Sequence, residues 1–115
     1  MKAHGLRSSL LAGAFALATP FAMADSAVPL EFKGADLRLG ERLIREHRCT
    51  ECHVRKVGGD GSAIYRPLGR INRPSALIAM VELCSVELKL QLFPEDVQAV
   101  AGVLQRDHYR FKPVP

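Results

Sequence analysis

Two cysteines and a histidine stand close together near the middle of the chain, in the run Cys49-Thr50-Glu51-Cys52-His53. Two thiols three positions apart on a helical turn can reach the two vinyl groups on one edge of a porphyrin and bond to them. The imidazole that follows can then bind iron as the proximal ligand. This spacing is typical of covalent haem attachment, and it predicts one haem c bound through Cys49, Cys52 and His53.

Three other interpretations of the same residues are weaker. A redox Cys-x-x-Cys is typical of a strand-helix-strand context, which the surrounding pattern lacks. A zinc site needs a second pair of ligands at regular spacing, and Cys84 is the only further cysteine. A short structural disulfide leaves His53 without a role. The sequence therefore favours haem.

The first 24 residues have the build of a secretory signal peptide. A basic start precedes an apolar stretch from Leu10 to Ala18 and an Ala-Met-Ala cleavage site at 22–24. The stretch is shorter than the roughly 20 residues that span a bilayer, and Pro20 interrupts it, which disfavours a membrane anchor. We therefore expect residues 25–115 to form one cytochrome c domain in the periplasm, with no membrane span.

Maturation also changes the charge. The chain has 16 lysines and arginines against 12 acidic residues, a formal net charge of +4. Loss of Lys2 and Arg7 halves this charge, and two haem propionates bring it near zero. Because a basic stripe is the footprint of nucleic-acid binding, we expect no nucleic-acid partner. So small a domain has little apolar core, and a buried haem would stabilise it.

Helical periodicity frames the cysteine motif. Apolar residues from Leu37 to Ile44 predict a first helix that begins near Ala35 and ends directly before Cys49. The final helix is the clearest, because Pro94 suits its first position and acidic residues follow where a helix N-terminus is positive. Its apolar stripe consists of Val97, Val100, Ala101 and Leu104.

Between these helices the pattern is mixed. Residues 55–73 are rich in glycine and proline and predict a long loop. A second helix is expected to begin at Ser75 as its N-cap. One face of this helix carries Leu77, Met80, Val81 and Cys84. Residues 85–92 alternate between apolar and polar, which is a strand-like period, and they are expected either to pair with residues 28–32 or to run extended over the haem. A shorter alternation at 28–32 contains Pro29, which limits any strand there to an edge.

Over its mature length the chain resembles the class I c-type cytochromes. The cysteine motif, Gly40 on the helix before it, and the final helix after Phe93 carry this resemblance. It implies an all-α class I cytochrome c fold with about three main helices around one haem. In that family a glycine of the first helix packs against an aromatic residue of the last, and Val103 takes the aromatic's place here.

A narrower resemblance is to small periplasmic monohaem cytochromes similar to the two subunits of the heterodimeric NaxLS cytochrome. It rests on the glycine-rich run from Gly58 to Tyr65, on Cys84, and on the ending Tyr109-Arg110-Phe111. In that subset the haem iron has histidine and cysteine axial ligands. The resemblance therefore implies a distal cysteine, together with a homo- or heterodimeric assembly.

Two residues compete for the distal position on the iron. Class I electron carriers usually bind iron through a methionine before the last helix, and both Met80 and Cys84 lie in that window. They are four apart, so on a helix they share a face and only one can lie over the iron. Cys84 is favoured as the unpaired cysteine of an exported chain, Met80 is the alternative, and an open site is the third possibility. His108 is a remote fourth candidate and is expected mainly as a helix-end cation, and His47 is expected as a surface residue.

The loop after the motif carries groups that suit haem propionates. Tyr65 can donate its hydroxyl to one of them. Guanidinium groups bind carboxylates in a bidentate fork, so one loop arginine is a further partner. The candidates are Arg66, Arg70 and Arg73.

Together these features predict a periplasmic monohaem c-type cytochrome that transfers electrons through its haem iron to redox partner proteins, without catalytic residues. The alternative is a haem protein that binds or senses NO or CO when Cys84 leaves the iron. A third hypothesis is a redox subunit of a larger oxidoreductase. The distal ligand separates the first two, because an anionic thiolate favours ferric iron and a thioether favours the reduced state.

Overall fold

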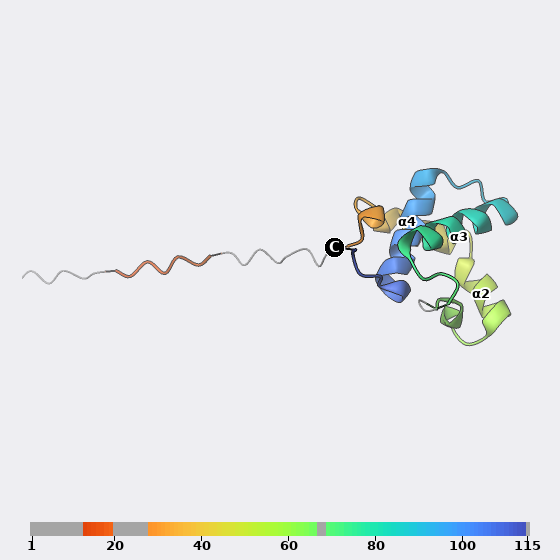
Figure 1. Cartoon of the computed structure of the whole chain (residues 1–115), viewed down its shortest axis with the longest axis horizontal. Coiled ribbons are helices and arrows are strands. Elements are labelled where there is room, and N and C mark those ends of the chain that lie inside the picture. Colours follow the sequence, from red (N-terminus) through yellow and green to blue (C-terminus); the bar gives the residue numbers. More distant parts are fainter. Residues whose placement is uncertain (1–12, 20–27, 67–68, 115) are drawn as a thin grey trace, which may run out of the picture.

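The computed structural model describes residues 13–19, 28–66 and 69–114, and within these ranges the protein is all-α, without strands (Figure 1). The all-α prediction is confirmed. The α-helices are α1 (Leu37–Glu46), α2 (Cys49–Val57), α3 (Pro74–Glu87) and α4 (Pro94–Leu104). The short turns are the 3-10 turns η1 (Leu30–Phe32) and η2 (Ser62–Ile64) and the π-helical turn η3 (Gln105–Tyr109), which directly follows α4.

The predicted signal peptide, residues 1–24, lies for the most part outside the described residues. Its described part, residues 13–19, forms no helix. Across the described ranges, no helix combines the length and the apolar character needed to cross a membrane.

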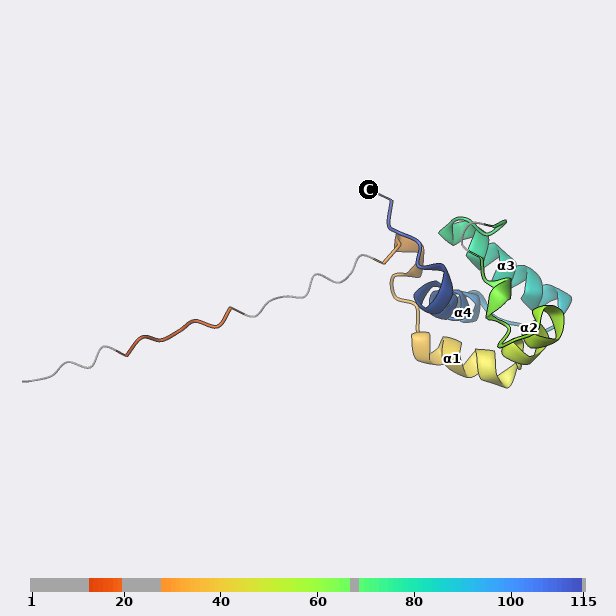
Figure 2. The same ribbon diagram turned by 90° about the horizontal axis from the view of Figure 1, so that it is seen from below.

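The crossing of α1 and α4 holds the domain together. These two helices share the most extensive contact between any two of the described elements, and Figure 2 shows α1 passing close beside α4. A Cβ atom added at Gly40 would overlap the backbone carbonyl of Ala99 and lie 2.8 Å from Cγ2 of Val103. Gly40 therefore packs directly on α4, and Val103 is the α4 side chain that it faces.

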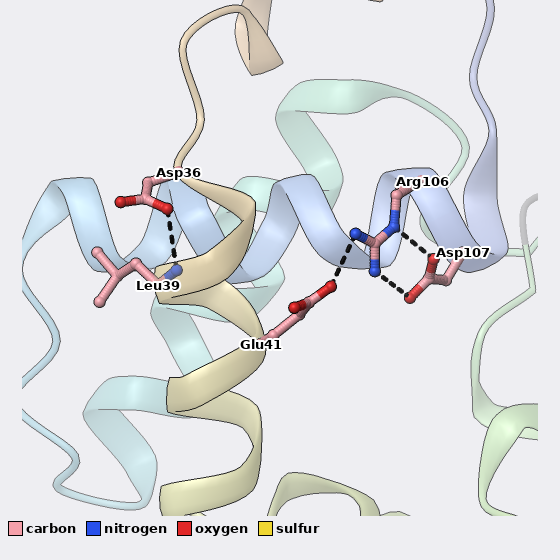
Figure 3. Close-up of polar contacts among 5 residues, drawn as sticks. All are labelled: Asp36, Leu39, Glu41, Arg106 and Asp107. Carbon is pink, nitrogen blue, oxygen red and sulfur yellow. Dashed lines mark hydrogen bonds and ion pairs between the residues drawn. The ribbon is translucent and has the colours of Figure 1, made fainter.

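Polar contacts cap α1 and connect it to the turn after α4 (Figure 3). The Asp36 carboxylate caps α1 by accepting a hydrogen bond from the backbone N–H of Leu39 at 3.0 Å. The Arg106 guanidinium contacts Glu41 of α1 at 2.8 Å and Asp107 at 2.7 Å. Arg106 thereby ties the turn after α4 to α1, and it lowers the pKa of Asp107 through its hydrogen bonds.

The core lies between α3, α4 and η1. The predicted stripe of α4 is buried, as are Leu77 and Val81 of α3. Phe32 of η1 packs into the same cluster, and so does Tyr109 of η3. Because α4 contributes half of this buried cluster, more than any other described element, α4 is the central helix of the domain.

The structure differs from the sequence prediction along the motif. The predicted loop begins at residue 55, yet α2 continues to Val57. About three main helices were expected, and α2 is the additional helix that brings the described residues to four α-helices. Arg48 adopts the left-handed conformation, with φ of 53°, and separates α2 from α1. One residue thus turns the chain sharply, and the whole motif becomes helical.

Three further segments differ from the sequence prediction. Ser75 is not the N-cap of α3, because Pro74 takes the first helical position and Arg73 precedes it as the cap. Residues 86–92 do not form a strand, since α3 continues to Glu87 and positive φ angles at Lys89 and Gln91 bend the chain after it. The short alternation at 28–32 forms η1 instead of an edge strand.

Candidate functional site

One cavity of about 580 Å³ brings the predicted site residues together. From α2 it is lined by Cys49, Cys52 and His53, and from α3 by Met80 and Cys84. Figures 1 and 2 show α2 and α3 near one another at one end of the domain. The predicted proximal ligand thus comes from α2 and the two candidate distal ligands from α3, and both helices border one cavity.

The positions on α2 follow from helical spacing. Cys49, Cys52 and His53 lie at i, i+3 and i+4, so they share one face of the helix. Gly61 allows the following chain to return against that face, because a Cβ atom there would lie 3.1 Å from Cβ of His53, and its φ of +83° is unfavourable for other residues. The motif is therefore covered by its own downstream loop.

Apolar side chains form most of the remaining wall. The volume of the cavity, about 580 Å³, is within the range of about 300 to 1,000 Å³ that small-molecule and cofactor pockets occupy. The apolar residues of the wall are Leu43, Ile44, Ile64, Ile71, Leu77, Val81, Leu88, Leu90, Leu92, Val100 and Leu104. Leu88, Leu90 and Leu92 come from the segment predicted as strand-like, so their alternation reflects the lining of a cavity rather than a sheet.

All three thiols are free and half-buried. Burial raises the pKa of Cys49, and burial together with the negative charge of Glu87 raises the pKa of Cys84. Buried thiols in apolar surroundings are unreactive as nucleophiles. A metal ion in this cavity would be needed to hold Cys84 as a thiolate, because coordination deprotonates a thiol.

His53 is held as a neutral imidazole with one engaged nitrogen. The hydroxyl of Tyr65 lies 2.6 Å from its Nδ1 atom. Burial, with the positive charge of Lys56 as a smaller cause, lowers the pKa of His53. Since the neutral ring is the form that ligates metals and the bond at one nitrogen directs the metal to the other, Nε2 is the candidate ligand atom.

Tyr65 takes a different role from the one predicted. It was expected to donate to a haem propionate, and the structure pairs it with His53. Burial raises the pKa of Tyr65, so the phenol stays neutral at physiological pH. The sequence carried no signal for this pair, because the two residues are twelve positions apart and meet only through the turn at Gly61.

Basic side chains line part of the same cavity. Arg66 and Arg70 are among them, as predicted for propionate partners, and so is Lys56, which the sequence analysis missed. Arg73 is not, since its Nε donates to Ser75 Oγ at 3.2 Å. Lys56 lies three positions after His53 on α2. A predicted helix that continued past the motif would have placed Lys56 on the same face as His53.

The two other histidines among the described residues differ in position. His47 is half-buried and lines the cavity beside the motif. His108 lies on η3 and stacks on the ring of Tyr65, with centroids 4.3 Å apart. His108 is therefore close to the site through Tyr65, although it does not line the cavity.

The donor set fits a covalently attached haem. Two thiols on one helix face could form the two thioether bonds, and His53 together with Cys84 or Met80 could ligate the iron. The apolar wall suits a flat apolar macrocycle, and Arg66, Arg70 and Lys56 suit its two carboxylates. Within the described ranges no three His, Cys, Asp or Glu side chains gather as ligands of a protein-only metal site. Comparisons with protein-family models, with curated proteins and with solved structures return no match.

Proposed function

We propose that this chain is a periplasmic c-type cytochrome that transfers electrons. The observation that carries the proposal is the single cavity bordered by Cys49, Cys52 and His53 on one side and by Cys84 and Met80 on another helix. Residues that are 35 positions apart along the chain meet there, which the spacing of the motif alone did not require. Redox proteins are the proposed partners.

In this proposal the protein supplies attachment, ligation and shelter from water. The thiols of Cys49 and Cys52 hold the haem, His53 is the proximal ligand and Cys84 the distal ligand, with Met80 as its alternative. The haem supplies the one-electron redox couple. The apolar wall lowers the local dielectric constant, so charges next to the iron act on it more strongly than they would in water.

The proposal includes a class I cytochrome c fold. Its support is the order of the elements: α1 carries Gly40 against α4, the cysteine motif begins directly after α1, and α4 closes the domain. At the crossing, Val103 stands where the family has an aromatic residue. The close approach of the two helices at Gly40 is compatible with a valine at this position.

The deciding experiment is an intact-mass measurement on the protein produced in a bacterial host that attaches haem c. We expect one species that corresponds to residues 25–115 plus one haem, and the haem should stay with the polypeptide after denaturation. The control is the same chain from a host without the attachment machinery. A mature protein with unmodified Cys49 and Cys52 would contradict the proposal.

A second candidate function is binding of a diatomic gas. It is favoured by the position of Glu87, which lines the cavity with Cys84 and opposes a negative charge on its sulfur. Reduction removes one positive charge from the iron, and Cys84 would then be held less tightly. We expect CO to bind to the reduced protein and not to the oxidised protein, as followed by absorption spectra. Absence of CO binding in both states would leave electron transfer alone.

A further inference from the structure

Tyr65 is enclosed by aromatic rings from the end of the chain. The His108 ring stacks on it, with centroids 4.3 Å apart and planes at 27°. Tyr109 meets it edge to face, with centroids 6.1 Å apart, and Phe111 stacks on Tyr109 at 5.4 Å. We call His108, Tyr109 and Phe111 the aromatic bracket. Such offset and edge-to-face pairs are favourable beyond the area they bury.

The turn η3 holds the aromatic bracket in place. The side chain of buried Gln105 donates to the backbone carbonyl of Phe111 at 3.0 Å and accepts from the backbone N–H of Phe111 at 3.0 Å. Tyr109 is only 4% exposed and belongs to the core. Because η3 continues α4 directly, the position of the bracket is set by the central helix of the domain. Single π-helical turns of this kind are frequent at functional sites.

Within the aromatic bracket, Tyr65 touches His53 in two ways. Its hydroxyl lies 2.6 Å from Nδ1, and the two rings meet edge to face at 78° with centroids 5.1 Å apart. A tyrosine has two side-chain torsions, and the stacked His108 ring on one side restricts both. The hydroxyl is thus held at a fixed place next to one nitrogen of the predicted proximal ligand.

We propose that Tyr65 is a positioning residue that orients His53 and tunes its strength as an iron ligand. This inference rests on the proposed function. With Nε2 bound to a metal, Nδ1 carries the ring proton and donates it in a hydrogen bond to the Tyr65 oxygen. Such outer partners fix the ring plane of a ligating histidine and raise its basicity. A more basic imidazole stabilises ferric iron more than ferrous iron.

A second cavity lies beside this contact. It has a volume of about 340 Å³, is lined by both His53 and Tyr65, and also contains Asp60, Ser62 and Asp107. The polar side chains of its lining can hydrogen-bond water. Without the hydroxyl, Nδ1 of His53 would contact mobile water. Such water would not fix the plane of the imidazole ring, and it would accept a hydrogen bond from Nδ1 less uniformly than the Tyr65 oxygen does.

The test is Tyr65→Phe in the haem-loaded protein, because this change keeps the ring and removes the hydroxyl. We expect haem attachment to persist, the reduction potential to rise and the ferric electron-spin-resonance signal to shift or broaden. Loss of an outer partner typically weakens metal binding about 10- to 100-fold. Each tenfold loss that is confined to the ferric state corresponds to about 59 mV for a one-electron couple.

The matched control is Asp36→Ala, which removes the cap of α1 and destabilises the domain without touching the cavity. It should lower thermal stability and leave potential and signal unchanged, as a purely structural effect would. A second measurement uses the unmodified protein: the Nδ1 proton of His53 should exchange slowly with solvent in NMR spectra of the reduced state.

The outcomes are distinct. If Tyr65→Phe has the potential and the ferric signal of the unmodified protein, the inference is wrong while the proposed function stands. If Tyr65→Phe does not fold, fast exchange of the Nδ1 proton in the unmodified protein overturns the inference, and slow exchange supports it. If the unmodified protein carries no covalent haem, the proposed function fails, and this inference fails with it.

Discussion

Two sulfur-bearing side chains of α3 face the same cavity, and their chemistry as iron ligands differs. Met80 and Cys84 are four residues apart, one turn of the helix, and both line the cavity. A thioether is neutral, whereas a thiolate brings a negative charge next to the iron. In a cavity with apolar walls this charge stabilises ferric iron more strongly than it would in water.

At the residue scale we therefore predict opposite results for two substitutions in the haem-loaded protein. Cys84→Ala should change the ferric absorption spectrum and raise the reduction potential, because the ferric state loses an anionic ligand. The rise should be at least about 59 mV, which is one factor of ten in the preference for the ferric state. Spectroelectrochemical titration measures both quantities.

Met80→Leu is the matched control, since it removes the sulfur at nearly constant volume. It should leave the spectrum and the potential close to those of the unmodified protein. A far-red thioether-to-iron band in the native ferric protein, or a loss of the native spectrum in Met80→Leu alone, would assign the distal position to Met80. That result would also favour a plain electron carrier over gas binding.

The sequence predicted the residues of the site better than their partners. Cys49, Cys52 and His53 are fixed by local spacing within one helical turn, and such a pattern is visible in any single sequence. Tyr65 contacts His53 because the chain turns back at Gly61. Lys56 lines the cavity because α2 is longer than predicted. Contacts that depend on a turn or on the end of a helix carry no periodic signal.

At the scale of the helices, the prediction was best where burial and periodicity coincide. The stripe of α4 is buried along its whole length, so its 3.6-residue period was correctly interpreted. The segment 86–92 failed because its leucines face the cavity from a bent segment with two left-handed residues, Lys89 and Gln91. Alternation then arises without a sheet, since Leu88, Leu90 and Leu92 line the cavity whereas Lys89 and Gln91 do not.

At the scale of the helices we predict that Gly40→Ala destabilises the crossing of α1 and α4. Gly40→Ala places a Cβ atom against the backbone carbonyl of Ala99, which cannot rotate away, so the two helices must separate. Overpacking of this kind costs about 1 to 3 kcal/mol, which exceeds the gain in helix propensity of at most about 1 kcal/mol. Denaturant unfolding of the haem-loaded protein should therefore show a lower free energy of unfolding.

Gly102→Ala on α4 is the matched control for this substitution. Its added Cβ would meet the side chains of Ala35 and Leu37, at 2.9 and 3.1 Å, and not a backbone carbonyl. These side chains lie at the start of α1 and just before it, where small shifts are possible. We expect a smaller loss of stability than for Gly40→Ala, and equal losses would show that backbone contact does not decide the cost.

At the scale of the whole molecule, the domain is built around a space that its own side chains do not fill. The described fold holds a small core on α3 and α4, and beside it lies the cavity of about 580 Å³. In a well-packed interior, voids much larger than a water molecule are rare. An apolar wall of this extent is therefore expected to belong to a bound group that completes the core.

The last prediction follows from this incomplete core. The double variant Cys49→Ala with Cys52→Ala should carry no covalent haem and should lose cooperative unfolding. Without the haem, the apolar wall of the cavity would face water, and this exposure would cost a large part of the stability of about 5 to 15 kcal/mol of a typical domain. The apolar wall offers this water few partners. Calorimetry and circular dichroism should therefore show a poorly structured chain, whereas Cys84→Ala, with both attachment cysteines intact, should keep its haem and a sharp transition. A double variant that unfolds cooperatively at the temperature of the haem-loaded protein would show that the core is complete without haem, and the cytochrome proposal would then fail.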